Sequence, residues 1–113
     1  MGLEMITTQF LISALKSRYC IDSFYGVAKA LEVTKAAAYD WKHGRTTIGE
    51  PVARRVADLL GVDVSVIYAA MQAEKATDPH SKAIWIGIYA KIGGQDAYDF
   101  IKKTCFDQKK NAA

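Results

Sequence analysis

The residues of this sequence that could do chemistry are concentrated in a basic segment between Ser23 and Arg55. The segment holds six lysine and arginine residues against three acidic ones, an excess as large as the formal charge of +3 of the whole chain. Ammonium and guanidinium groups gathered in this way neutralise phosphates, which dominate the affinity of proteins for nucleic acids. The alternative is a solvated charged face without a ligand. The cations are Lys29, Lys35, Lys42, Arg45, Arg54 and Arg55, and the acidic residues are Glu32, Asp40 and Glu50.

The other reactive side chains form no such pattern. His43 and His80 stand alone, without the spaced ligands that a metal site needs, so we predict no metal. No phosphate-binding G-x-x-x-x-G-K motif and no signature of a catalytic nucleophile occurs, so we predict neither an enzyme nor a cofactor. Cys20 and Cys105 lack a C-x-x-C spacing. We expect both thiols to be buried, in a protein of the reducing cytoplasm.

Length and composition limit the architecture to one small protein with a core. The chain has 113 residues, of which 50% are hydrophobic and 24% are charged. That content of apolar residues is sufficient to bury a core and argues against disorder. No apolar run reaches the roughly 18 residues that a membrane-spanning helix needs. We therefore expect a soluble, cytoplasmic protein without a membrane partner.

Helices must position the basic segment, because apolar residues recur at helical spacing along most of the chain. No stretch alternates apolar and polar residues as a half-buried strand would. A Ser, Thr or Asp precedes most of the periodic segments, and glycine or a polar stretch follows them. The sequence therefore predicts an all-α protein. The expected helices cover residues 8–19, 24–31, 35–42, 50–60, 64–71, 79–92 and 95–106.

Two of these helices carry a recognisable pattern, since residues 24–41 read FYGVAKALEVTKAAAYDW. The small residues Ala28 and Ala38 allow two helices to cross closely, Val33 fills the corner between them and Trp41 closes the second helix. This pattern resembles the helix-turn-helix of the Cro/CI-type, lambda-repressor-like transcriptional regulators. The family often has glycine where Glu32 stands, and a residue other than glycine with a positive φ costs about 1 kcal/mol. Ala38 is smaller than the valine or isoleucine often found there.

The resemblance covers roughly residues 8–76 and implies a five-helix lambda-repressor-like domain. We expect residues 1–76 to form this DNA-binding domain, residues 77–106 to form a C-terminal helical hairpin and residues 107–113 to be a flexible tail. The stretch AAMQAEKATDPHSKAIW is similar to the tail of small regulators carried by prophages. The implied function is a sequence-specific DNA-binding transcriptional regulator, a phage or prophage repressor that occupies an operator.

The resemblance also implies which residues touch DNA. At the exposed face of helix 35–42, Lys35 can donate to guanine and Ala36 can contact a thymine methyl. Asp40 can accept from cytosine, or it can pair with a nearby cation of its own helix, and Tyr39 can meet a base or a phosphate. Sequence discrimination is expected to depend partly on DNA shape, because no Asn, Gln or Arg lies on this face. The expected phosphate contacts are Ser23, Thr34, Lys42, His43, Arg45 and Thr46.

The C-terminal hairpin is too apolar to be hidden against a domain that has its own core. We expect it to form a homodimer interface that places two recognition helices about one DNA turn, roughly 34 Å, apart on a near-palindromic operator. The alternative is an antitoxin-type regulator whose hairpin binds a partner protein, and either a toxin or an antirepressor is a possible partner. The residues expected at this interface are Ile84, Trp85, Ile88, Tyr89, Ile92 and Ile101.

Overall fold

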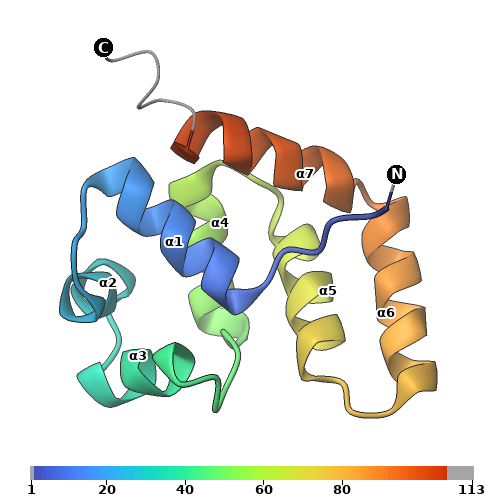
Figure 1. Cartoon of the computed structure of the whole chain (residues 1–113), viewed down its shortest axis with the longest axis horizontal. Coiled ribbons are helices and arrows are strands. Elements are labelled where there is room, and N and C mark those ends of the chain that lie inside the picture. Colours follow the sequence, from blue (N-terminus) through green and yellow to red (C-terminus); the bar gives the residue numbers. More distant parts are fainter. Residues whose placement is uncertain (1, 107–113) are drawn as a thin grey trace.

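The computed structural model describes residues 2–106, and within them the chain consists of helices and short connections (Figure 1). The all-α prediction is confirmed. Between residues 2 and 106, seven α-helices are followed by one π-helical turn, η1. None of the described helices is long and apolar enough to cross a membrane. The elements are α1 (Thr8–Tyr19), α2 (Phe24–Leu31), α3 (Lys35–Lys42), α4 (Glu50–Leu60), α5 (Val64–Lys75), α6 (Pro79–Lys91), α7 (Gly94–Ile101) and η1 (Lys102–Phe106).

Local sequence decides where most of these helices begin. Ahead of five of them, a side-chain oxygen accepts a hydrogen bond from a backbone N–H two or three residues further on, which satisfies one of the free donors of the first turn. α4 instead has Pro51 in its first turn, where the missing N–H costs nothing. The five capping residues are Thr7, Ser23, Thr34, Asp63 and Asp78.

The two cysteines have different surroundings. Cys105 is buried, as predicted, and burial raises the pKa of its thiol. Cys20 is exposed, so the prediction of burial is wrong for this residue. Its backbone ends α1 in the left-handed conformation, with φ 56°, and that turn carries the side chain into solvent. No sequence signal identified this turn, because left-handed positions are usually taken by glycine or asparagine.

The core gathers around α1, which packs against α2, α3, α4 and η1. Phe10 is only partly buried, and its ring stacks on Tyr98 of α7 with the centroids 4.4 Å apart. Other apolar residues that recur at helical spacing in α1 to α5 are buried, so this periodicity follows the inward faces of these helices. These are Leu15, Val27, Leu31, Trp41, Val56, Leu60 and Ile67.

The last two helices are divided between different parts of the molecule. α6 lies along α5, whereas η1, which continues α7, packs against α1 (Figure 1). Tyr89 and Ile101 are therefore fully buried in the same core cluster as residues of α1 to α5. Their assignment to a dimer interface is wrong, because their side chains offer no surface to a second chain. The expected flexibility of residues 107–113 lies outside the described residues.

Tyr89 forms hydrogen bonds that connect the segment before α1 with the junction between α6 and α7. Its hydroxyl accepts from the Ile6 N–H at 3.1 Å, and the Glu4 and Gly94 carbonyl oxygens lie at 2.8 and 3.1 Å as acceptors. A Cβ at Gly94 would come within 2.3 Å of the Tyr89 ring, so this close approach requires glycine. Burial raises the pKa of Tyr89 to about 12. The neutral phenol is therefore part of the folded structure.

Tyr89→Phe should lower the free energy of unfolding by about 1–3 kcal/mol, because the Ile6 N–H and a carbonyl lose their buried partner. The folded pKa is raised above the ordinary value of 10, so this stabilisation is complete below pH 10 and is lost as the pH rises towards 12. Urea unfolding at pH 7 and across pH 10–12 measures both effects. Tyr68→Phe, at an exposed tyrosine, is the control. An unchanged alkaline dependence in Tyr89→Phe would contradict the assignment.

Candidate functional site

The turn between α2 and α3 holds the two helices of the site at a fixed angle. Glu32 ends α2 in the left-handed conformation, with φ 58°, and the Val33 N–H donates to the Ala28 carbonyl at 2.9 Å. This is the hydrogen bond that commonly closes a helix at a left-handed residue. Arg55 of α4 supports the turn, since its Nε donates to the Ala30 carbonyl at 3.2 Å and its guanidinium lies 3.5 Å from the Glu32 carboxylate.

The inner face of α3 is anchored in the core. Trp41 is 4% exposed and Ala38 is 1% exposed, while Ala28 of the adjoining α2 is 2% exposed. The Gln9 side-chain amide of α1 donates to the Trp41 carbonyl, which attaches the C-terminal end of α3 to α1. Because this face is held inside, the opposite face of α3 must point to solvent.

The outward face of α3 carries the residues that we expected to read bases. Lys35 and Ala36 are exposed, and Tyr39 is 54% exposed. Asp40 is partly buried, and its carboxylate lies 3.4 Å from the Arg45 guanidinium. Its cation partner is thus Arg45, just beyond the helix, rather than a lysine within it. This pair is open to solvent, so both groups remain accessible to a ligand.

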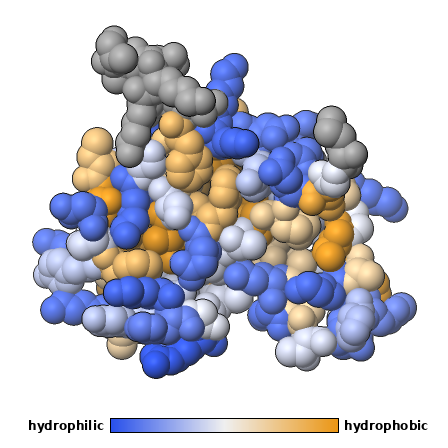
Figure 2. All heavy atoms as spheres, in the orientation of Figure 1, coloured by the Kyte–Doolittle hydropathy of each residue, from blue (hydrophilic) through white to orange (hydrophobic). Residues whose placement is uncertain are grey.

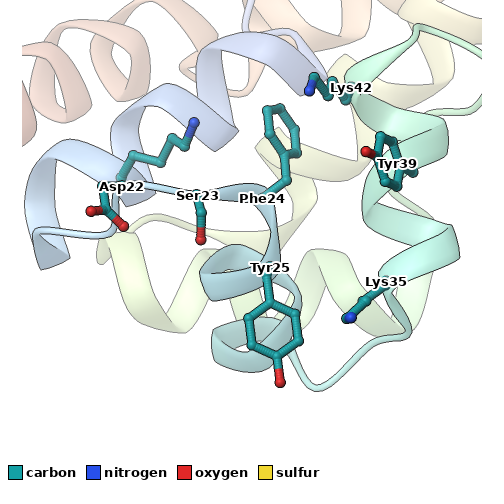
Figure 3. Close-up of a pocket in the computed structure, with 8 residues that line it drawn as sticks. Asp22, Ser23, Phe24, Tyr25, Lys35, Tyr39 and Lys42 are labelled. Atoms are coloured by element: carbon teal, nitrogen blue, oxygen red, sulfur yellow. The ribbon is translucent and has the colours of Figure 1, made fainter.

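A hollow of about 560 Å³ opens between the end of α1, the beginning of α2 and α3 (Figure 3). Figure 3 shows Phe24 at its centre, with Lys42 on one side and Ser23 at the start of α2 on the other. The first turn of α2 adds the partial positive charge of its free N–H groups. The lining residues are Lys16, Asp22, Ser23, Phe24, Tyr25, Lys35, Tyr39 and Lys42.

The lysines of this hollow lie over aromatic rings. The Lys16 ammonium is 4.5 Å from the centroid of Phe24, and the Lys42 ammonium is 5.5 Å from the same centroid. The Lys35 ammonium is 4.8 Å from the centroid of Tyr25. A ring attracts a cation without neutralising its charge. Within residues 2–106 the three ion pairs all involve arginine, so these ammonium groups keep their charge available to an anion.

Of the expected phosphate contacts, Ser23 and Lys42 line this hollow and the other four do not. Ser23 and Thr34 are exposed, but their oxygens accept the capping hydrogen bonds of α2 and α3 at 3.0 and 3.1 Å. His43 stacks on Tyr39 at 5.5 Å. Arg45 and Thr46 line a separate hollow of about 360 Å³ against α5. The structure therefore brings together Ser23, Lys35, Tyr39 and Lys42, and it separates Arg45 and Thr46 from them.

Sequence reasoning missed Lys16, Phe24 and Tyr25 as parts of this hollow. Lys16 precedes the basic segment and belongs to another helix, so no local spacing connects it with Lys42. The two aromatic residues directly follow the capping Ser23, and their position beside a helix N-terminus was the signal that could have identified them. Among the described residues, no group of three His, Cys, Asp or Glu side chains could hold a metal ion.

Comparison with protein-family models, with curated proteins and with solved structures found no match for this chain.

Trp41→Ala should unfold the protein at temperatures where the parent chain is folded. Truncation of a buried tryptophan costs about 3–5 kcal/mol, a large share of the stability of a small domain. Thermal melting measured by circular dichroism tests this expectation. Tyr39→Ala, two residues away on the exposed face, should change the stability by no more than about 0.5 kcal/mol. Equal melting temperatures for the two variants would contradict the anchoring role of Trp41.

Glu32→Gly should be more stable than Glu32→Ala by about 1 kcal/mol, because only glycine adopts a positive φ without strain. Both variants lose the carboxylate that lies near Arg55, so the difference between them isolates the backbone conformation. Chemical denaturation of the two proteins measures it. If alanine proved as stable as glycine at this position, the turn would not be left-handed in solution.

Proposed function

We propose that this protein is a sequence-specific DNA-binding transcriptional regulator, a repressor of the phage or prophage type that occupies an operator and blocks polymerase. In this proposal the N-terminal five helices act as a lambda-repressor-like domain. α3 enters the major groove, and the hollow between α1, α2 and α3 receives the DNA backbone. No cofactor takes part.

One observation carries the proposal: three ammonium groups, from Lys16, Lys35 and Lys42, surround the start of α2 without carboxylate partners among the described residues. A phosphate diester is a compact anion that both features favour, since the helix N-terminus offers N–H donors and the lysines offer charge. Asp22 is the only acidic residue lining the hollow. The hollow is wide and open, as a backbone that passes along a surface requires.

The face of α3 next to this hollow supplies contacts that can distinguish base pairs. Lys35 stands at the first position of α3, where a recognition helix meets base edges. Ala36 follows it and presents a methyl group. Asp40 faces Arg45 through its Oδ1, so Arg45 competes with a base for this carboxylate, whereas Arg45 can turn to a phosphate when Asp40 is engaged. We therefore assign base reading chiefly to Lys35 and Ala36.

Lys35→Ala should weaken binding to the preferred duplex by about 1–3 kcal/mol more than it weakens binding to random duplex, because a base contact is lost together with the charge. Gel shifts on both duplexes measure this, with the preferred sequence taken from footprinting of the DNA that flanks the protein's own gene. Arg45→Ala should weaken both duplexes alike. Equal losses on the two duplexes for Lys35→Ala would remove Lys35 from base reading.

Lys16→Ala and Lys42→Ala should each weaken binding to every duplex and reduce the slope of log K against log salt by about 1, the value for one phosphate contact. Lys102→Ala, at an exposed lysine on η1, is the matched control and should change neither quantity. Titrations at a series of salt concentrations decide between the outcomes. A slope that is the same in Lys16→Ala, Lys42→Ala and Lys102→Ala would mean that the hollow does not receive DNA.

A further inference from the structure

The hollow between α1, α2 and α3 has features that a phosphate backbone alone does not use. A phosphate needs cations and N–H donors, yet the rings of Phe24, Tyr25 and Tyr39 also line this hollow. Two of these rings are largely open to solvent, since Tyr25 is 53% exposed and Tyr39 is 54% exposed. The volume of about 560 Å³ lies within the range of pockets that bind small molecules. Rings and cations together favour a ligand that has both a planar group and an anionic group.

Asp22 is a second feature that DNA does not explain. It is exposed, it is the one acidic residue among the described residues that line the hollow, and it takes part in none of the three ion pairs within residues 2–106. A carboxylate repels a phosphate that passes beside it. It can instead accept hydrogen bonds from sugar hydroxyl groups, as an acidic residue does for the ribose of many bound nucleotides.

The cations of the hollow leave a place for one phosphate near Phe24. The Lys16 ammonium lies 4.5 Å and the Lys42 ammonium 5.5 Å from the centroid of this one ring. Rotation of these flexible side chains can therefore bring both ammonium groups to a single phosphate. Figure 3 shows Asp22 and Tyr39 at opposite sides of the hollow, with Phe24 between them. A ligand that extends from Phe24 towards Asp22 thus meets the cations first and the carboxylate next.

Tyr25 supplies a ring on which a base can stack. The Lys35 ammonium lies 4.8 Å and the Lys29 ammonium 5.6 Å from the centroid of Tyr25. A cation over an exposed ring is held weakly, so a base can take its place. The Lys35 ammonium would then lie at the edge of the stacked base, where it can donate to O6 and N7 of guanine.

We propose that this hollow binds one free purine ribonucleotide, with its phosphate on Lys16 and Lys42, a ribose hydroxyl on Asp22 and its base on Tyr25 beside Lys35. Figure 2 shows mainly hydrophilic residues over α2 and α3, a surface that suits a charged and hydrated ligand. The proposal rests on the proposed function in one respect, since it assigns a regulator to the hollow that receives DNA. The bound nucleotide excludes the DNA backbone and so releases the protein from an operator.

Titration of the full chain with guanosine monophosphate (GMP), followed by nuclear magnetic resonance, tests the site without DNA. The backbone signals of residues 22–25 should shift, with a dissociation constant of about 10–500 µM. Deoxy-GMP should bind at least fivefold more weakly, because it lacks a hydroxyl that donates to a charged acceptor. Inorganic phosphate should bind at least tenfold more weakly than GMP. No binding at about 5 mM GMP, or equal affinities for GMP and either control ligand, would overturn the proposal.

Asp22→Ala tests the assignment of the ribose. The substitution removes a negative charge from the hollow and so strengthens the binding of any anion, which makes the ratio of the GMP and deoxy-GMP affinities the informative quantity. This ratio should fall to about one, because the hydroxyl loses its acceptor. Asp58→Ala, at an exposed aspartate on α4, is the matched control and should keep the ratio of the parent chain. A preference for the ribonucleotide that persists in Asp22→Ala would contradict the proposed pose.

Tyr25→Leu tests the assignment of the base. It should weaken GMP binding about tenfold and leave the affinity for inorganic phosphate unchanged, because only the stacking surface is lost. Tyr68→Leu, at an exposed tyrosine on α5, is the control and should change neither affinity. The unchanged phosphate affinity also shows that the variant is folded. GMP binding that is equal in the two leucine variants would remove Tyr25 from the site.

The nucleotide proposal and the proposed function can fail separately. GMP binding without duplex binding would support the nucleotide site and refute the DNA-binding regulator. Duplex binding that depends on Lys16 and Lys42, in a chain that does not bind GMP, would refute the nucleotide site alone. Where both ligands bind, saturating GMP should displace the duplex, and Asp22→Ala should strengthen duplex binding because a like charge is removed. A duplex that saturating GMP does not displace would refute a shared hollow.

Discussion

The burial of Trp41 is the interaction on which the arrangement of this protein depends. α3 has only eight residues, and a helix of that length is not stable by itself in water. Its position is determined by the tryptophan at its end and by the small Ala38 that lets it lie close to α2. Once that face is inside, the direction of every other α3 side chain follows, including Lys35 and Tyr39.

The lysine ammonium groups of the candidate site lie over the aromatic rings of Phe24 and Tyr25, at the beginning of α2. A surface lysine commonly pairs with a carboxylate, and such a pair would hide its charge from a ligand. Here Phe24 lies beneath the ammonium groups of Lys16 and Lys42, and Tyr25 lies beneath those of Lys29 and Lys35, so these side chains are partly ordered while the charge persists. Ordering before binding reduces the entropy that a ligand contact would otherwise cost.

The C-terminal helices pack against two different parts of the protein. α7 and η1 complete the core around α1, with Ile101 and Cys105 fully inside. α6 packs along α5 and, through Tyr89, holds the residues that lead into α1. The Glu74 carboxylate at the end of α5 adds a further link, since it accepts from the Thr8 N–H at 2.8 Å and so stabilises the N-terminus of α1. Both links join helices from the second half of the chain to the residues at the beginning of α1 and just before it.

The sequence by itself determined the helices and most of their limits. Capping by Ser23, Thr34 and Asp78, and the turn at Gly61, are local effects in which a side chain or a glycine acts on the backbone within a few residues. Helical periodicity likewise identified the inward faces of α1 to α5, because a buried stripe repeats every three or four residues. Capping residues, glycine turns and apolar periodicity act within a few residues, so the sequence alone is enough to recognise them.

Only the tertiary structure decided which surfaces meet. Tyr89 bonds to a backbone 83 residues away, and no local pattern distinguishes this buried tyrosine from the exposed isoleucines beside it. Lys16 joins Lys42 at one ring because α1 passes that point, although the sequence places them in different helices. Contacts of this kind depend on how the helices cross, and crossing is decided by the packing of whole faces rather than by the spacing of neighbouring residues.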